Sequence, residues 1–156
     1  MSTENGLKSR IQADINDAVR AGDDLLKSTL RMALAAIMNA EVAGAEAVSL
    51  SDDQIINLLR SEVKKRAESA DIYEQAGRAE SAATERKEMV IIEKYLPAAM
   101  DEAALAAIVA EEVANAAANG QTGPKAMGGV IKAVKERVGA SADGSAIAAA
   151  VKSALN

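Results

Sequence analysis

The sequence contains no cysteine, histidine, tryptophan or phenylalanine, and its aromatic residues are Tyr73 and Tyr95 alone. Without cysteine there is no thiol nucleophile and no disulfide framework, and without histidine there is no imidazole base. A zinc site of the usual kind and a Ser–His–Asp triad are both excluded, because each needs those residues. We therefore expect no metal, no cofactor and no catalytic residue in this chain.

Long apolar runs are also missing. No stretch approaches the roughly 18 apolar residues that a membrane span needs. Residues 1–6 have neither the charged start nor the apolar core of a signal peptide. From these two absences we expect no membrane partner and a cytoplasmic location.

Positive charge is scarce overall but gathers near the C-terminus. The formal net charge is −5, so the chain lacks the global basic footprint of a nucleic-acid-binding protein. Residues 98–120 carry four acids and no base, whereas residues 121–156 carry five bases and two acids, a local charge of +3. The C-terminal segment is therefore locally basic on an acidic protein.

Alanine is the abundant residue, at 36 of 156 positions. It is the best helix former and fills a sheet face poorly. Apolar residues recur every three or four positions along most of the chain, which is the helical period, and no segment alternates like a strand. The sequence predicts an all-α protein.

Cap and turn residues divide this pattern into seven helices, four before Pro97 and three after it. Gly22 is expected to end the first helix, and Ser51–Gln54 has the form of a capping box at the start of the third. Pro97 marks a boundary, because the residue before a proline disfavours helical geometry. We expect an N-terminal four-helix subdomain over residues 6–97 and a small three-helix subdomain over residues 98–156.

Seven short motifs occur in order between residues 7 and 155. They are Ser28–Arg31, Ala36–Glu41, Glu62–Arg66, Tyr73–Arg78, Glu93–Pro97, Met127–Val130 and Ala142–Gly144. Each is weak alone, but the ordered set resembles the GatB/YqeY family, and in particular its stand-alone YqeY-like members. One departure is Ser141, which stands where the family usually has a basic residue.

The resemblance implies an all-helical fold and a link to tRNA. Similar domains form the tail of the GatB subunit of the tRNA-dependent amidotransferase and are appended to some glutaminyl-tRNA synthetases, where they are associated with tRNA binding. The family is therefore linked to carbon–nitrogen ligase activity with glutamine as amido-N-donor. The partners that the resemblance implies are tRNA or a tRNA-charging or amidotransferase complex.

The residues themselves offer no such catalysis. Lys27–Ser28 and Lys152–Ser153 are mere sequence neighbours, which point in different directions on a helix. Gly123 and Gly128 have half of a P-loop spacing, but Gly129 and Val130 replace its Lys-Ser/Thr pair. We expect any ligase activity to belong to a larger assembly.

The sixth expected helix, residues 125–138, is the leading candidate for an RNA contact. At about 100° per residue its three lysines share the face opposite the apolar stripe, and two adjacent glycines lie on that lysine face. A glycine inside a helix costs about 1 kcal/mol relative to alanine. Close approach of an RNA backbone would explain the two adjacent glycines. They would also be explained by a helix that begins at the second glycine, or by the need for space beside a neighbouring helix. The candidate RNA-binding residues are Lys125, Gly128, Gly129, Lys132 and Lys135.

A secondary candidate lies on the third expected helix and consists of Arg60, Lys64 and Lys65. The alternative there is intrahelical pairing at i,i+4, of Glu62 with Arg66 and of Lys64 with Glu68.

Three other residues are expected to have structural roles. Arg31 lies among Leu, Met and Ala, so we expect it to pair with Glu41 or Glu62, because burial without a partner would cost several kcal/mol. Tyr73 and Tyr95 are expected in the core, since two tyrosines are too few for a base-stacking platform.

These observations leave three functions, of which a non-catalytic tRNA-interaction module comes first. A protein-interaction adaptor without RNA binding is the alternative, and an enzyme is the third. The salt dependence of binding distinguishes the tRNA module from the adaptor, because binding to phosphate weakens steeply as the salt concentration rises.

Overall fold

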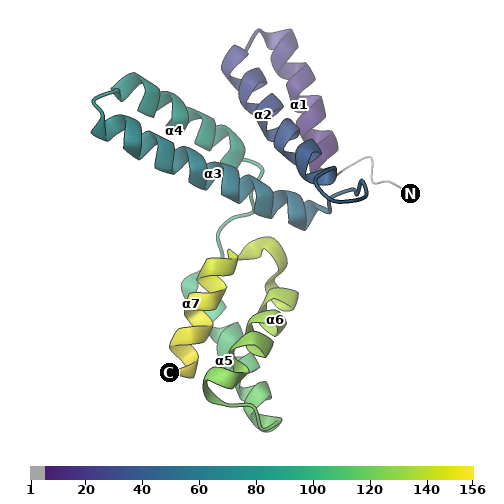
Figure 1. The fold of residues 1–156 in the computed structure, drawn as a ribbon, viewed down its shortest axis with the longest axis vertical. Coiled ribbons are helices and arrows are strands. Elements are labelled where there is room, and N and C mark those ends of the chain that lie inside the picture. The colour runs from purple at the N-terminus through teal and green to yellow at the C-terminus, as the bar shows by residue number, and fades with distance from the viewer. Residues whose placement is uncertain (1–5) are drawn as a thin grey trace. The chain divides into compact units, whose positions relative to one another are not determined.

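The computed structural model describes residues 6–156, and over this range the protein has seven α-helices and no strand. The all-α prediction is confirmed. The helices are α1 (Leu7–Ala21), α2 (Asp24–Glu41), α3 (Asp52–Gln75), α4 (Ala79–Glu93), α5 (Glu102–Ala118), α6 (Met127–Val138) and α7 (Gly144–Leu155) (Figure 1). The expectation about a signal peptide falls almost entirely on residues 1–5, which lie outside the described residues. Within residues 6–156, no helix is long and apolar enough to cross a lipid bilayer.

The chain contains two compact units, Met1–Leu96 and Pro97–Asn156. The first unit holds α1–α4 and the second holds α5–α7.

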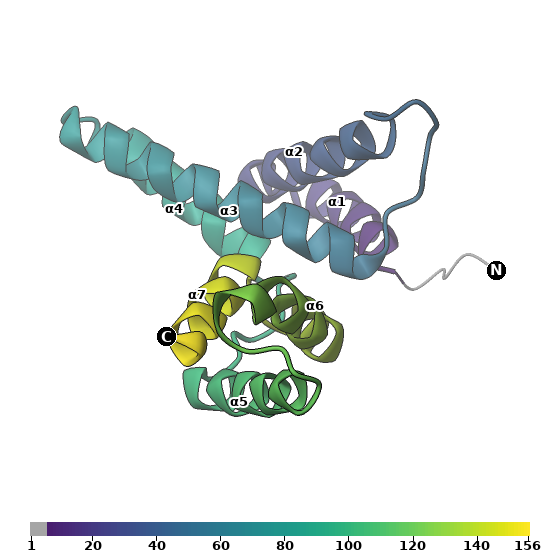
Figure 2. The ribbon, with the colours of Figure 1, turned by 60° about the horizontal axis from the view of Figure 1, so that its bottom comes forward.

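In the first unit, the hairpin of α1 and α2 packs against the hairpin of α3 and α4, and the far end of the second hairpin extends beyond the first (Figures 1 and 2). Isoleucine and leucine side chains from all four helices form the core, which Tyr95 closes after α4. The core residues are Ile11, Ile15, Leu30, Ala33, Ile37, Ile55, Leu59, Ile92 and Tyr95.

Local signals set most of these helix ends as expected. Gly22 ends α1 in the left-handed conformation, with φ 70°. Asp23 then caps α2, because its side chain accepts a hydrogen bond from the N–H of Leu26. The capping box at Ser51 and Gln54 is present at the start of α3.

One helix end and one side chain of the first unit differ from the sequence-based expectation. α4 ends at Glu93 rather than running up to Pro97, and the N–H of Tyr95 bonds to the carbonyl of Ile92 in a tighter turn. Val19, which was expected in the apolar stripe of α1, is 51% exposed.

The second unit packs α5, α6 and α7 around a smaller core made mostly of valine and alanine. The buried members are Leu105, Val109, Ala126, Val130, Val134, Val138, Ala142, Ile147 and Val151. A hydrogen bond from the N–H of Met100 to the carbonyl of Ser141 joins the start of the unit to the turn before α7.

The helix expected over residues 125–138 begins later than predicted, at Met127. The four residues before it, Gly123–Ala126, form a 3-10 turn that has Pro124 near its start. Proline has no N–H and its φ is fixed, so it suits such a first turn. Lys125 therefore lies in the 3-10 turn and not on α6.

Candidate RNA-binding surface

All five primary candidate residues are exposed, on the 3-10 turn and α6. We call Lys125, Gly128, Gly129, Lys132 and Lys135 the lysine surface. On the other side of α6, Val130, Val134 and Val138 are buried in the core of the second unit. The amphipathic division predicted for this segment is therefore present, although Lys125 belongs to the preceding turn.

The two glycines are not there to admit a neighbouring helix. A Cβ on Gly128 would meet nothing within 4 Å, and one on Gly129 would lie 3.7 Å from the side-chain oxygen of Gln121, an ordinary contact. Both residues lie in the first turn of α6. One of the alternatives left by the sequence is thus removed, and what the pair provides is exposed backbone with no side chain over it.

The lysine surface reaches the start of α7. A Cβ on Gly144 would lie 3.8 Å from Nζ of Lys135, so that ammonium group stands beside the first residue of the helix. Asp143 caps the same helix and accepts a hydrogen bond from the hydroxyl of Ser145 at 2.8 Å. The carboxylate of Asp143 therefore offsets part of the positive charge at this end.

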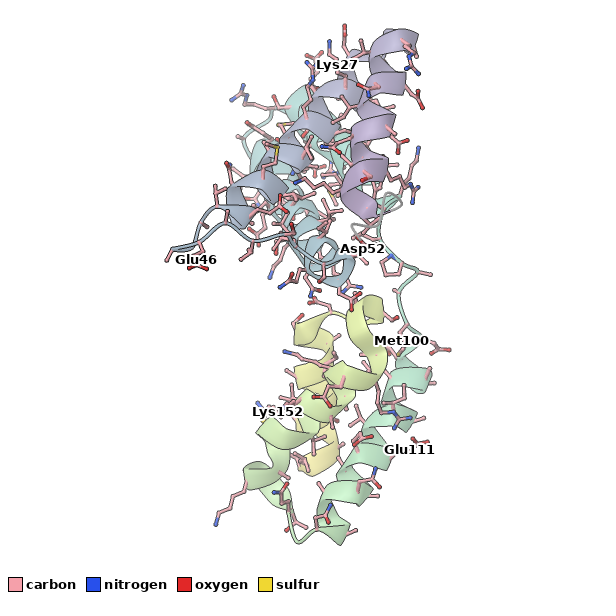
Figure 3. The ribbon with its side chains drawn as sticks, turned by 90° about the vertical axis from the view of Figure 1, so that its right-hand side faces the viewer. Lys27, Glu46, Asp52, Met100, Glu111 and Lys152 are labelled. Atoms are coloured by element: carbon pink, nitrogen blue, oxygen red, sulfur yellow. The ribbon has the colours of Figure 1, made fainter. Side chains whose placement is uncertain are left out.

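The acids of α5 are paired with Arg137 rather than with the lysines. Nη1 of Arg137 lies 2.7 Å from Glu111, which is labelled in Figure 3, and 3.1 Å from Glu112. The hydrogen bonds that Arg137 donates to these two carboxylates raise its pKa above the usual value. Within residues 6–156, Lys125 and Lys132 form no ion pair, so their charges are available to a ligand.

The secondary candidate cluster is largely engaged within the protein. Lys65 forms an ion pair with Glu62 at 3.3 Å, and Arg60, which is half-buried, donates to the side-chain oxygen of Asn57. Lys64 is exposed, and the pair expected between it and Glu68 does not occur among the described residues.

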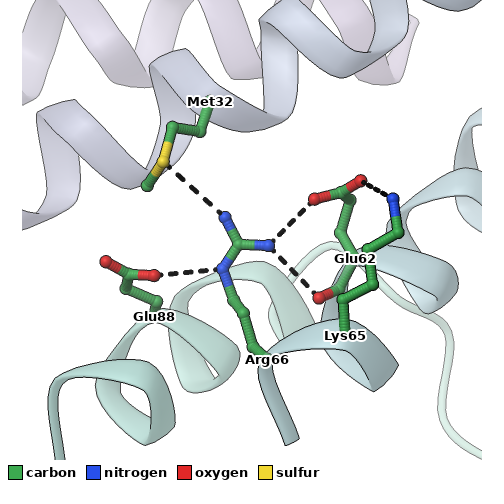
Figure 4. Close-up of polar contacts among 5 residues, drawn as sticks. All are labelled: Met32, Glu62, Lys65, Arg66 and Glu88. Carbon is green, nitrogen blue, oxygen red and sulfur yellow. Dashed lines mark hydrogen bonds and ion pairs between the residues drawn. The ribbon is translucent and has the colours of Figure 1, made fainter. Parts of the chain in front are cut away.

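Arg66 is the best-connected charged side chain of the first unit (Figure 4). It is 7% exposed, and its Nη1 donates to the carboxylate of Glu62 at 2.9 Å, as the i,i+4 spacing predicted. Its Nε donates to Glu88 of α4 at 3.1 Å, a partner that helical spacing could not reveal. The remaining nitrogen, Nη2, lies 4.0 Å from the sulfur of Met32 on α2.

This cluster shifts the pKa of two glutamates in opposite directions. Burial pushes the pKa of Glu62 upward, but hydrogen bonds from Arg66 and Lys65 outweigh burial, so the pKa is below its ordinary value. The pKa of Glu85 is raised, first by burial and then by the negative charge of Glu88, although Arg66 partly opposes the rise.

The expected pairing of Arg31 is wrong. Arg31 is exposed and forms no ion pair with another residue in the described range. Glu41, one of its expected partners, pairs with Lys8 of α1 and accepts a hydrogen bond from the N–H of Leu50. The start of α1 is also connected to α3, because the N–H of Leu7 donates to Asp52, which is labelled in Figure 3, at 3.1 Å.

The two tyrosines differ in burial. Tyr95 is buried, donates a hydrogen bond to the carboxylate of Asp14, and lies beneath the guanidinium of Arg10. Burial, followed by this hydrogen bond, raises the pKa of Tyr95. Tyr73 is only half-buried, with Arg78 5.1 Å from its ring centre. The core expectation is thus confirmed for Tyr95 alone.

A groove of about 640 Å³ runs between α2 and α3 in the first unit. Its lining combines neutral polar, apolar and charged side chains: Ala36, Asn39, Asn57, Leu58, Ser61, Glu62 and Lys65. The hydroxyl of Ser61 donates to the backbone carbonyl of Asn57, and Lys65 is paired with Glu62. The serine, the glutamate and the lysine of the groove are thus each engaged in a contact within the protein.

Comparison with known proteins gives two matches. The family model described as "Yqey-like protein" matches residues 8–155 of this chain. A similar curated protein is "Altered inheritance of mitochondria protein 41, mitochondrial" from Clavispora lusitaniae, with 34% identity over 99 residues. The match covers 62% of this chain and 56% of that relative, so it spans little more than half of the relative's length.

Proposed function

Because the chain belongs to the YqeY-like family over residues 8–155, we propose that it is a tRNA-interaction module that binds RNA through the lysine surface. The observation that carries this proposal is the combination of exposed lysines with uncovered glycine backbone at the start of α6. Lysine is a compact point charge suited to phosphate, and contacts to phosphate supply most of the affinity in non-specific nucleic-acid binding.

The proposed module acts without catalysing a reaction itself. Carbon–nitrogen ligase activity with glutamine as amido-N-donor belongs, in this proposal, to a larger amidotransferase or tRNA-charging complex with which the chain associates. Support comes from the side chains of the α2–α3 groove, where the one serine and the one lysine are engaged in structural contacts.

Titration of labelled tRNA at several salt concentrations tests the binding surface. The variant Lys125→Gln/Lys132→Gln/Lys135→Gln removes three charges from helical or turn positions where glutamine is well tolerated. Loss of three phosphate contacts should reduce the slope of log affinity against log salt concentration by about two to three. Circular dichroism checks that the variant is folded.

The matched control removes the same number of charges from exposed positions of the first unit that are not RNA-binding candidates, as Arg31→Gln/Lys87→Gln/Lys94→Gln. We expect the control to keep the wild-type salt slope. If the two variants lose affinity equally, the effect is one of total charge and the lysine surface is rejected. If the wild-type protein binds no tRNA even at low salt, the tRNA function itself is rejected.

A protein-interaction adaptor is the second candidate, and exposed apolar side chains favour it. Met38, Val42 and Ile72 are 51%, 64% and 66% exposed, respectively. Apolar docking survives high salt, whereas phosphate contacts do not. A partner that co-purifies from cells equally well at low and high salt would favour the adaptor.

We also propose that residues 6–97 and 98–156 are separate subdomains, of four and three helices respectively, and that the first folds without the second. The second has a small core, and a segment of about 60 residues is marginal on its own. Circular dichroism of the two separate fragments tests this: an unfolded 1–97 fragment beside a stable 98–156 fragment would contradict the proposal.

The proposed location is the cytoplasm. The relative from Clavispora lusitaniae carries the word mitochondrial in its name, which describes that protein. Microscopy of the chain fused to a fluorescent protein in its own cells distinguishes a diffuse cytoplasmic signal from an organellar one.

A further inference from the structure

Arg66 has one poorly matched hydrogen bond. Two of its nitrogens donate to carboxylate oxygens, those of Glu62 and Glu88, at 2.9 and 3.1 Å. The acceptor that Nη2 meets is the thioether sulfur of Met32, 4.0 Å away (Figure 4). A thioether is a weak acceptor, whereas a buried guanidinium N–H is a strong donor that gains most from a strong acceptor.

Met32 is also accessible from solvent. Its exposed fraction is 45%, and the chain has no cysteine, so methionine supplies all of its sulfur. Among methionines, exposure to solvent favours oxidation by small peroxides. The Met32 side chain is therefore accessible to an oxidant, and its sulfur is adjacent to a nitrogen, Nη2 of Arg66, that has no oxygen partner among residues 6–156.

We propose that Met32 is an oxidation site, at which hydrogen peroxide converts the thioether to a sulfoxide whose oxygen accepts a hydrogen bond from Nη2 of Arg66. A sulfur lone pair attacks one peroxide oxygen, the S–O bond forms and the O–O bond breaks. The departing hydroxide takes up the remaining proton and leaves as water. The sulfur loses two electrons and the peroxide gains them.

Oxidation of Met32 is expected to stabilise the protein, whereas oxidation of a core methionine destabilises it. A sulfoxide within an apolar core disrupts packing, because a polar group is buried there. At Met32 the new oxygen keeps access to water and faces a charged donor instead. Met32 lies on α2, Arg66 on α3 and Glu88 on α4, so the new bond strengthens the joint between the two hairpins of the first unit. The change is reversible, because methionine sulfoxide reductases restore the thioether.

The test treats the full chain with hydrogen peroxide and measures oxidation of each methionine by mass spectrometry of peptides. Met38 is the internal reference, because it lies on the same helix with a similar exposed fraction of 51% and its sulfur accepts no hydrogen bond from another described residue. Thermal unfolding is then compared between the wild type and Met32→Leu, each before and after treatment. All other methionines are present in both proteins, so the difference isolates Met32.

We expect Met32 to gain one oxygen atom and the peroxide-induced shift in melting temperature to be about 2 to 4 °C more positive in the wild type than in Met32→Leu. Met32→Gln, which carries an amide oxygen near the position of the sulfoxide oxygen, should raise the melting temperature without peroxide. The proposal is overturned if Met32 stays reduced while Met38 is oxidised, or if treatment lowers the melting temperature of the wild type as much as that of Met32→Leu.

Discussion

Arg66 and Glu88 are 22 residues apart in sequence, yet Nε of the one lies 3.1 Å from Oε2 of the other across the α3–α4 hairpin. Both side chains are largely buried, at 9% and 14% exposed. With Glu62, they form a cluster in which one cation pairs with two carboxylates.

Replacement of Arg66 by methionine should destabilise the protein by about 2 to 3 kcal/mol. The variant keeps much of the packing volume but leaves Glu88 without an ion-pair partner among the described residues and Glu62 with Lys65 alone. An unpaired charge in a buried cluster is costly. Urea unfolding of the full chain measures the loss. Lys65→Met is the matched control, because Lys65 also pairs with Glu62 but is 71% exposed. It should cost less than about 0.5 kcal/mol. Equal losses would show that the burial of Arg66 is unimportant.

Glu85 should lower the stability of the protein at neutral pH. Its pKa in the folded state is above the ordinary value of 4.5, because of burial and the adjacent Glu88. The folded state then holds the proton more tightly than the unfolded state, so the stability contributed by this group falls as pH rises through the window between the two pKa values.

Glu85→Gln should therefore stabilise the protein at pH 7, by about 0.3 to 0.5 kcal/mol given the partial exposure of the side chain. The gain should shrink toward pH 4, where the carboxyl group is increasingly protonated in both states. Urea unfolding at the two pH values measures it, and a gain independent of pH would contradict this account.

Thr29 has a buried hydroxyl without a partner. The residue is 0% exposed, and within residues 6–156 its Oγ1 has no hydrogen bond. Thr29→Val keeps the shape and removes the desolvated hydroxyl, so it should raise the free energy of unfolding by about 1 kcal/mol. Thr84→Val is the control, because the Thr84 hydroxyl is exposed and bonds to the carbonyl of Glu80 at 3.1 Å. A change of less than about 0.5 kcal/mol is expected for it. Thermal or urea unfolding that ranks the two variants the other way would refute the prediction.

The parts of this structure that follow from sequence are those set by near neighbours along the chain. The glycine after α1, the aspartate that caps α2 and the capping box at Ser51 act over a few residues, and all three are present as expected. The Glu62–Arg66 pair belongs to the same class, because i,i+4 spacing brings the two residues together on any helix.

Contacts between helices could not be predicted in the same way. Glu41 pairs with Lys8 rather than with Arg31, and Tyr95 bonds to Asp14, 81 residues away. Such partners depend on how one helix crosses another, which apolar period alone does not specify. For the lysine surface, the sequence indicated the exposed face of α6, whereas the closeness of Lys135 to the start of α7 is a result of tertiary packing.

If the lysine surface binds RNA, it should prefer a duplex to a single strand. Both aromatic residues of the chain, Tyr73 and Tyr95, lie outside residues 97–156, so the second unit has no ring on which a base could stack. Stacking is a main source of affinity in single-strand binding, while lysines respond to phosphate density, which is higher in a duplex. Fluorescence anisotropy at low salt should show at least about tenfold tighter binding to an RNA hairpin than to an unstructured oligouridine of equal length. Equal or tighter binding of the single strand would mean that bases are contacted by some other surface.

The two glycines at the start of α6 should separate stability from RNA binding. Neither Gly128 nor Gly129 has a positive φ, and the space around each would accommodate a methyl group. Alanine at either position should therefore stabilise the protein, by about 0.5 kcal/mol, because alanine favours the helix more than glycine does. If an RNA backbone approaches this turn, the same methyl group lies in its path, and RNA affinity should fall at least about threefold. The salt slope should stay the same, because no charge is removed.

Gly44→Ala in the α2–α3 connection is the control. A Cβ there would lie 3.7 Å from the carbonyl of Glu46, and the RNA affinity of this variant should equal that of the wild type. Urea unfolding and titration of labelled tRNA on the same preparations give both quantities. Alanine variants that gain stability and bind RNA as the wild type does would restrict the site to the lysine side chains and exclude close contact with the glycine backbone.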